Sequence, residues 1–147
     1  LAGRASVAAW SPADGAVAVA GFTGGPPGYR HWVLVWAPGR DPQPAPLPPD
    51  CAVDGLSWSA DGRLLAIGRR CGDDGADATR QLATALVEVA TGRTIRDLAG
   101  VSRAQFAPGR PGLVAHSGGP NDPVVHLFGV PAGARPEPRL YMPAASR

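Results

Sequence analysis

One phrase occurs three times in this chain at a constant interval, and it limits the possible folds more than any other feature. Trp10, Trp58 and Phe106 stand 48 positions apart, and each opens a copy of the phrase. In the first two copies Asp-Gly follows within a few positions and an apolar run comes next, and the third copy has Pro-Gly in place of Asp-Gly. Self-similarity at a fixed period of about 20–50 residues indicates a repeat architecture. The sequence therefore predicts three copies of one structural unit.

Each copy continues in the same way after its first two apolar runs. A third apolar run ends in a glycine-containing turn, at residues 32–39, 85–92 and 124–133. A last short segment follows at 94–98 in the middle copy and at 139–142 in the final one. Short runs bounded by Gly, Pro, Asp and Asn are typical of antiparallel strands, whereas no stretch shows the 3.6-residue apolar period of a helix. Each copy is therefore predicted to be a four-stranded antiparallel meander.

A four-stranded meander of about 40–50 residues is one blade of a β-propeller. We therefore expect an all-β chain of three such blades, a partial or half ring, in a single propeller segment covering residues 1–147. The blades are expected at about 5–48, 53–100 and 101–146. Six prolines between Pro38 and Pro49 predict an extended loop in place of a regular fourth strand in the first blade. Because proline cannot serve a central strand, this segment is expected at an outer edge.

The middle copy carries a resemblance to a known family. Residues 56–67, Leu-Ser-Trp-Ser-Ala-Asp-Gly-Arg-Leu-Leu-Ala-Ile, resemble the signature of TolB-type and WD-repeat propellers, and residues 87–93 are similar to the third strand and turn of such blades. The Gly-His and Trp-Asp dipeptides of WD repeats are missing, so the chain is more similar to the TolB type. The resemblance covers essentially the whole chain, and it implies a propeller that serves as a binding scaffold.

Three blades cannot close a ring, since propellers close with about four to eight. One interpretation, which we favour from the sequence, is a piece of a longer propeller with further blades in cis. The other is a half-ring that pairs with a second copy in trans, giving a six-bladed ring of twofold symmetry, the commonest closed arrangement. Trp10, Trp58 and Phe106 are interpreted mainly as core packing between blades, because periodic apolar residues usually form a core; surface recognition is the alternative.

The two cysteines flank the central hairpin. Cys51 precedes its first strand, Cys71 follows its second, and the midpoint between them is residue 61, in the turn. Residues equidistant from a hairpin turn face each other at a distance that a disulfide can span. A Cys51–Cys71 disulfide and a pair of incidental thiols are both consistent with the sequence. Disulfides persist mainly in exported proteins, so an exported or periplasmic location and a cytoplasmic one both stay open.

Composition excludes two classes of partner. The net charge is +2, and all 14 basic residues are arginines spread along the chain without a cluster, a composition similar to that of proteins from GC-rich bacterial genomes. Nucleic-acid binding requires a clustered basic face, so we expect no nucleic-acid partner. No apolar stretch reaches the length of a membrane-spanning helix, so we expect no membrane span.

Catalysis has little support in the sequence. Residues 55–59 nearly spell the Gly-x-Ser-x-Gly nucleophile motif, but the last position is serine and the segment lies in a predicted hairpin, where the strand-to-helix elbow cannot form. The three histidines are isolated from one another and from any cysteine at metal-ligand spacing. We therefore expect no catalytic residues, no metal and no cofactor, and interpret the chain as not an enzyme.

Binding is expected at the loops between the second and third strands of each blade. These loops, at about 23–30, 72–80 and 117–123, are the most variable and polar parts of the repeats, and loops on a rigid scaffold concentrate binding residues. The candidate residues are Tyr29, Arg30, Asp73, Asp74, Asp77, Arg80, Asn121 and Asp122. The expected function is a non-catalytic scaffold that binds a protein or peptide partner. The alternative is an accessory substrate-gating propeller of a prolyl-oligopeptidase-like serine peptidase whose catalytic domain lies outside this chain.

Overall fold

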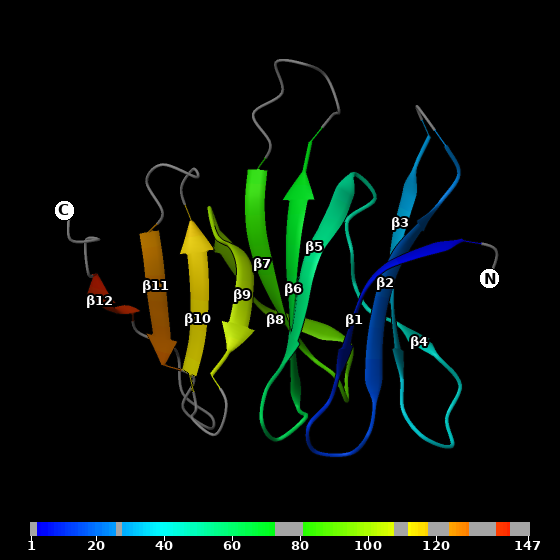
Figure 1. Cartoon of the computed structure of the whole chain (residues 1–147), viewed down its shortest axis with the longest axis horizontal. Coiled ribbons are helices and arrows are strands. Elements are labelled where there is room, and N and C mark those ends of the chain that lie inside the picture. The colour runs from blue at the N-terminus through cyan, green and yellow to red at the C-terminus, as the bar shows by residue number, and fades with distance from the viewer. Residues whose placement is uncertain are drawn as a thin grey trace.

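The computed structural model describes residues 3–25, 28–72, 81–107, 112–117, 124–129 and 138–141. These residues form twelve strands and no helix (Figure 1). The strands are β1 (Arg4–Trp10), β2 (Val17–Thr23), β3 (Arg30–Trp36), β4 (Gln43–Pro44), β5 (Cys51–Trp58), β6 (Leu64–Cys71), β7 (Gln81–Glu88), β8 (Arg93–Ala99), β9 (Ser102–Phe106), β10 (Gly112–Ser117), β11 (Val124–Gly129) and β12 (Pro138–Tyr141).

The twelve strands make three antiparallel sheets of four, each a meander in chain order. Sheet 1 contains β1–β4, sheet 2 contains β5–β8 and sheet 3 contains β9–β12. The predicted all-β class and its three four-stranded meanders are therefore confirmed. The proline-rich segment does contribute a fourth strand, but only the two residues of β4, which pair with Leu34 and Val35 at the outer edge of sheet 1.

The first strand of each sheet lies nearest to the neighbouring sheet. Strand β5 contacts β1 on one side and β9 on the other, whereas β4 and β8 make no such contacts among the described residues. The three sheets stand side by side in Figure 1, with sheet 2 in the middle. The sheets thus approach one another along the edge formed by their first strands and diverge toward their fourth.

The turn between β5 and β6 shows why a serine followed by Asp-Gly occurs after the tryptophan in the first two copies of the repeat. The Ser59 hydroxyl donates a hydrogen bond to the Asp61 carboxylate at 2.6 Å, and the same carboxylate accepts the backbone N–H of Arg63 at 3.1 Å. Gly62 has a φ of +70°, a conformation that a side chain would strain. The equivalent turn of sheet 1 uses Asp14, which accepts the backbone N–H of Ala16. Each acid therefore closes its own hairpin.

Hydrogen bonding in this turn has a consequence for acid stability. The Ser59 hydroxyl, followed by the backbone N–H of Arg63, holds the pKa of the Asp61 carboxyl below its usual value. A carboxyl with a lowered folded pKa stabilises the protein above its unfolded pKa, near 4, and loses that contribution as the pH falls through the folded value. Asp61 is exposed, so solvent screening keeps the contribution small.

We therefore predict that Asp61→Asn makes the free energy of unfolding depend less on pH in the acid range. Because asparagine cannot ionise, the free energy of unfolding of the variant should fall less between pH 6 and pH 3 than that of the parent chain. The difference between the two decreases should be below about 1 kcal/mol. Urea unfolding at a series of pH values measures this, with Asp41→Asn as a matched exposed acid outside the turn. Identical pH dependence of parent and Asp61→Asn would contradict the role given to the carboxylate.

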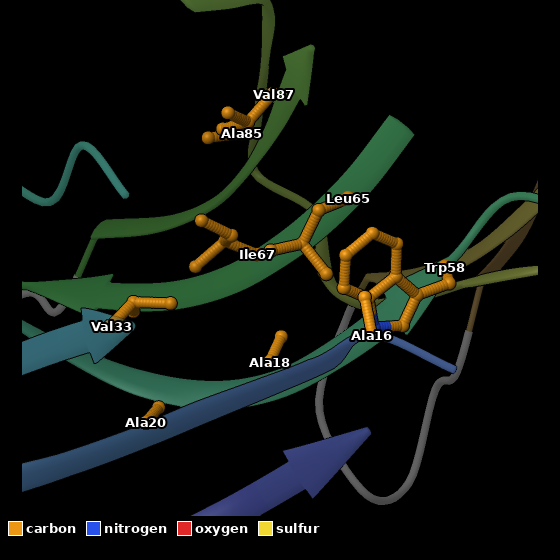
Figure 2. Packing of buried hydrophobic residues seen from close by; sticks show 9 residues of the cluster. All are labelled: Ala16, Ala18, Ala20, Val33, Trp58, Leu65, Ile67, Ala85 and Val87. Atoms are coloured by element: carbon orange, nitrogen blue, oxygen red, sulfur yellow. The ribbon is translucent and has the colours of Figure 1, made fainter. Parts of the chain in front are cut away.

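An apolar core fills the space between sheets 1 and 2. Small residues of sheet 1 meet larger ones of sheet 2, and alternation along the strands places both sets on facing surfaces. The fully or nearly fully buried members of this core are Ala16, Ala18, Ala20, Val33, Trp58, Leu65, Ile67, Ala85 and Val87. Figure 2 shows the Trp58 ring lying over Ala16, with Leu65 and Ile67 pointing toward the alanines of β2. The small alanine side chains leave room for the indole.

A second core joins sheets 2 and 3 through the opposite face of sheet 2. Its buried members are Ala66, Leu86, Leu98, Val101, Ala104, Leu113 and Ala115, with Phe106 packed against them. Buried Thr84 donates to the Val101 carbonyl oxygen at 2.9 Å, and the Phe106 backbone N–H donates to the Ser57 hydroxyl oxygen at 2.9 Å. Sheet 2 is therefore covered on both faces.

The three repeated aromatic residues differ in their surroundings. Trp58 is 6% exposed, and its indole Nε1 donates to the Ala9 carbonyl oxygen of sheet 1 at 2.9 Å. Phe106 is half-buried against the core between sheets 2 and 3. Trp10 is 73% exposed. The prediction of core packing is thus correct for Trp58 and Phe106 and wrong for Trp10, because no described segment packs on that face of sheet 1.

Candidate functional site

The predicted binding loops begin at one common end of the molecule. Strands β2, β6 and β10 all run toward the upper end in Figure 1, where β3, β7 and β11 begin. The strand ends there are Thr23 and Arg30 in sheet 1, Cys71 and Gln81 in sheet 2, and Ser117 and Val124 in sheet 3. We call this the loop end.

Tyr29 and Arg30 lie at the loop end, where sequence analysis placed them. Tyr29 is 40% exposed, and its ring meets Phe22 edge-on, with centroids 5.4 Å apart and an interplanar angle of 89°. Phe22 also contacts His31, its register partner, at 5.8 Å between centroids. The Arg30 side chain is exposed. An aromatic pair of this geometry contributes about 0.5–1.5 kcal/mol beyond its buried area, so Tyr29 is held in place while its outer edge stays accessible.

Glycine at the base of this loop makes the conformation possible. Gly24 has a φ of +84°, and a Cβ added there would lie 2.6 Å from the Gly28 carbonyl oxygen. The Gly28 backbone N–H donates to the Gly25 carbonyl oxygen at 2.7 Å, which closes the loop just before Tyr29. Only glycine can occupy position 24, because a side chain would clash with the returning backbone. The position of Tyr29 therefore depends on the backbone of its own loop.

Cys51 and Cys71 stand at the loop end of sheet 2 and are joined by a disulfide. They are direct register partners, with Cα atoms 4.0 Å apart. The cross-strand contact predicted from the hairpin midpoint is thus present. Of the two interpretations of the cysteines, the structure contains the disulfide and not a pair of free thiols. It fixes the start of β5 to the end of β6, just where the loop between β6 and β7 leaves the sheet.

Two ion pairs lie beside the disulfide. The Nε of Arg70 on β6 is 2.8 Å from the carboxylate of Asp54 on β5. The Arg69 guanidinium is 2.8 Å from the Asp97 carboxylate of β8, and its own Nε is buried without a hydrogen-bond partner. Arg70 and Asp97 are the more exposed members of the two pairs, so this part of the loop end has a polar surface of both signs.

Six of the eight predicted site residues lie outside the described part of the chain. They are Asp73, Asp74, Asp77, Arg80, Asn121 and Asp122. The structure therefore brings together Tyr29 and Arg30 alone, and the contribution of the other two loops stays a prediction.

A second exposed aromatic surface, which was not predicted from the sequence, lies on the outer face of sheet 1. Trp10 pairs across the sheet with Val17, and Val17 with Trp36, so the three share one row on one face. Trp36 is 57% exposed. A shallow depression of about 440 Å³ adjoins this row and is lined by Trp36, Gly39, Arg40, Asp41 and Pro42. Counting residues from the turn pairs Trp10 with Val17 in the hairpin, but this pairing alone does not indicate that the face is exposed.

Neither a metal-binding cluster nor a membrane-spanning helix is present among the described residues. No group of three or more His, Cys, Asp or Glu side chains is arranged to hold a metal ion within the described ranges. Among the same residues, no helix has the length and apolar character needed to cross a membrane.

Comparison with known proteins gives similarity at the level of structure and not of sequence. No protein-family model matches the chain, and no curated protein matches it either. A solved structure titled "Crystal structure of the eukaryotic initiation factor" is similar over 95% of this chain, with 13% identity and a TM-score of 0.34. The similar region is 55% of that protein, so this chain spans about half its length.

Proposed function

We propose that the three sheets are blades of a β-propeller and that the chain is a non-catalytic scaffold binding a protein or peptide partner at its loop end. The blade assignment is supported by the repeated four-strand meander and by the contacts between successive first strands. It is also supported by the recurrence of one turn, with Asp14 in sheet 1 and Asp61 in sheet 2. Three blades would form part of a ring, since propellers close with about four to eight.

The observation that carries the binding proposal is the arrangement of Tyr29. Its ring is held edge-on by Phe22 and is 40% exposed beside the exposed Arg30. Tyrosine and arginine are enriched among the residues that dominate binding energy at protein interfaces. A side chain already fixed in position loses less conformational entropy on binding than a free one. Tyr29 thus combines a favoured residue type with preorganisation, and Arg30 places a second favoured residue type beside it.

We predict that the double variant Tyr29→Ala, Arg30→Ala weakens partner binding by about 1–3 kcal/mol, or about 5- to 150-fold in Kd. Because exposed loop positions contribute little to stability, the free energy of unfolding should stay within about 0.5 kcal/mol of the parent. Any further loss should come from the ring contact between Tyr29 and Phe22. The partner is first identified by quantitative affinity purification from the source cells, and its affinity is then measured by titration calorimetry.

The matched control is Arg93→Ala, Ile95→Ala, which removes an exposed basic and an exposed apolar side chain from β8. Partner affinity should be unchanged in this control. Equal affinity of parent and Tyr29/Arg30 variant, or an equal loss in the control, would contradict a site at Tyr29. Peptide hydrolysis by the purified chain would contradict the non-catalytic assignment.

A further inference from the structure

Arg103 has an unusual backbone conformation for its residue type. Among the described residues it is the only one other than glycine with a positive φ, at +52°. It lies in a bulge of β9, in which Arg103 and Ala104 stand opposite the single residue Ala115 of β10. A residue with a positive φ in a bulge is typically glycine, which adopts this conformation without the strain that a side chain causes. Arginine at this position therefore carries a backbone strain that glycine would avoid.

Sheet 2 makes room for this bulge. Strand β9 lies against both β5 and β6, where Gly55 and Gly68 are register partners. A Cβ added at Gly68 would lie 3.0 Å from the Arg103 backbone nitrogen, and one added at Gly55 would lie 3.9 Å from the Arg103 Cα. The corresponding register partners in sheet 1 are Val7 and Ala20, which both carry side chains. The pair of glycines thus permits the close approach of the bulge to sheet 2.

The side chain of Arg103 is available to a ligand. It is exposed, and none of the ion pairs among the described residues includes it. Strained backbone of this kind persists where the surrounding packing fixes it, and it is found preferentially at functional sites. Packing against sheet 2 therefore fixes the backbone of Arg103, while its guanidinium stays free.

A second guanidinium projects from the same face of sheet 2. Arg70 is two residues beyond Gly68 on β6, so its side chain leaves the face of the sheet that approaches Arg103. Its Nε is 2.8 Å from the Asp54 carboxylate, and the side chain is 41% exposed. The carboxylate orients Arg70 through Nε and leaves the terminal nitrogens of the guanidinium toward other acceptors. Guanidinium groups bind carboxylates with paired, charge-assisted hydrogen bonds.

We propose that Arg103 and Arg70 form a binding site for the carboxylates of an acidic peptide segment, where sheets 2 and 3 meet near the loop end. Two arginines against the single acid Asp54 leave an excess of positive charge. A nucleic acid fits less well, because a long polyanion requires a clustered basic face and Asp54 places a carboxylate beside the arginines. The acidic segment would belong to the partner bound at the loop end, so this inference rests on the proposed function.

The test is the binding of a fluorescein-labelled, end-capped hexaglutamate peptide to the full chain, measured by fluorescence anisotropy. The parent is expected to bind this peptide and not the matching hexaglutamine peptide. Arg103→Asn removes the guanidinium but keeps a residue type that tolerates a positive φ. Its affinity for hexaglutamate should fall about 5- to 10-fold, the loss of one paired arginine–carboxylate contact. The double variant Asp54→Asn, Arg70→Gln removes both charges of the ion pair together and should lower the affinity to a similar extent.

Arg93→Gln is the matched control, since it removes the same charge from an exposed arginine on β8. Its affinity for hexaglutamate should change less than about twofold, because salt screens charges that lie far from the site. An equal loss in this control would overturn the proposal, since it would indicate attraction by net charge alone.

Arg103→Gly separates binding from folding. Because glycine adopts a positive φ without strain, this variant should unfold at a urea concentration no lower than that of the parent, while its affinity for hexaglutamate falls as in Arg103→Asn. A clearly lower unfolding midpoint would overturn the proposal, because the arginine would then be required by the fold itself.

Two further outcomes of the binding experiment would contradict an acidic peptide as the ligand. Equal affinity for hexaglutamate and hexaglutamine would exclude recognition of carboxylates. Tighter binding of a hexathymidylate than of hexaglutamate would assign the site to a nucleic acid instead. The experiment contains no partner protein, so its failure leaves the test of Tyr29 and Arg30 unaffected, and failure of that test leaves this measurement unaffected.

Discussion

Replacing Trp58 with alanine is expected to lower the free energy of unfolding by about 3–5 kcal/mol, the range for a buried tryptophan. The side chain is 6% exposed, fills the space over Ala16, and supplies the indole hydrogen bond to the Ala9 carbonyl oxygen. Its removal leaves a cavity between sheets 1 and 2 and a carbonyl oxygen without its donor. Urea denaturation followed by circular dichroism measures the difference.

The chain contains its own control for this substitution. Trp10→Ala changes the same residue type at the equivalent position of the repeat, but the side chain is 73% exposed. Its effect should stay within about 0.5 kcal/mol, as for other exposed sites. Equal destabilisation by both substitutions would contradict the assignment of Trp58, rather than Trp10, to an interface between sheets.

Removing the disulfide is expected to have the second-largest effect. The cysteines are 20 residues apart, and a cross-link closing a loop of that length stabilises by about 3 kcal/mol in the chain-entropy description. The double variant Cys51→Ala, Cys71→Ala should therefore unfold at a clearly lower urea concentration than the oxidised parent. Because Cys51 is buried, part of the loss comes from packing at that position.

Reduction of the parent chain with dithiothreitol provides the comparison for this prediction. It breaks the bond but keeps both side chains, so the reduced parent and the alanine variant should lose similar stability, apart from the packing of Cys51. Reductant should leave the alanine variant unchanged. Equal stability of the oxidised and reduced parent would contradict a bond between these two cysteines.

The repeat made most of the fold predictable from sequence. Aromatic residues at a constant interval, each followed by a turn with Asp-Gly or Pro-Gly, correctly predicted three antiparallel meanders. The Asp61 turn explains why: serine and aspartate side chains bond the backbone of the turn, and glycine takes the positive φ. These interactions depend on residues a few positions apart, so they can be read from the sequence directly.

The register of β5 against β6 could be predicted from the sequence only to within one residue, because β5 contains a bulge. From Trp58 to Gly55 the pairing of β5 with β6 follows the simple count from the turn, but between Val53 and Gly55 one residue is inserted. That shift brings Cys51 opposite Cys71 rather than opposite residue 72. The first strands of sheets 1 and 3 also pair with a register shift. A bulge depends on tertiary contacts along the strand, so the count from the turn alone could not locate it.

The candidate site was predictable in part. Tyr29 and Arg30 follow from the position of a variable loop and from residue type, and both are exposed at the loop end. The exposure of Trp10 was not expected, because equivalent residues in the three copies were all interpreted mainly as core packing between blades. Which copy is covered depends on what packs on each outer sheet, and a repeat pattern does not contain that information.

The most direct test of the account is the rate at which the tryptophan indole protons exchange with water, measured by NMR on ¹⁵N-labelled protein. Single Trp→Phe substitutions assign the signals. The Trp58 indole proton, buried and bonded to the Ala9 carbonyl oxygen, should be strongly protected, whereas that of Trp10 should exchange almost as fast as in a free indole. Exchange of Trp58 as fast as Trp10 would contradict the repeated contact between sheets on which the whole interpretation depends.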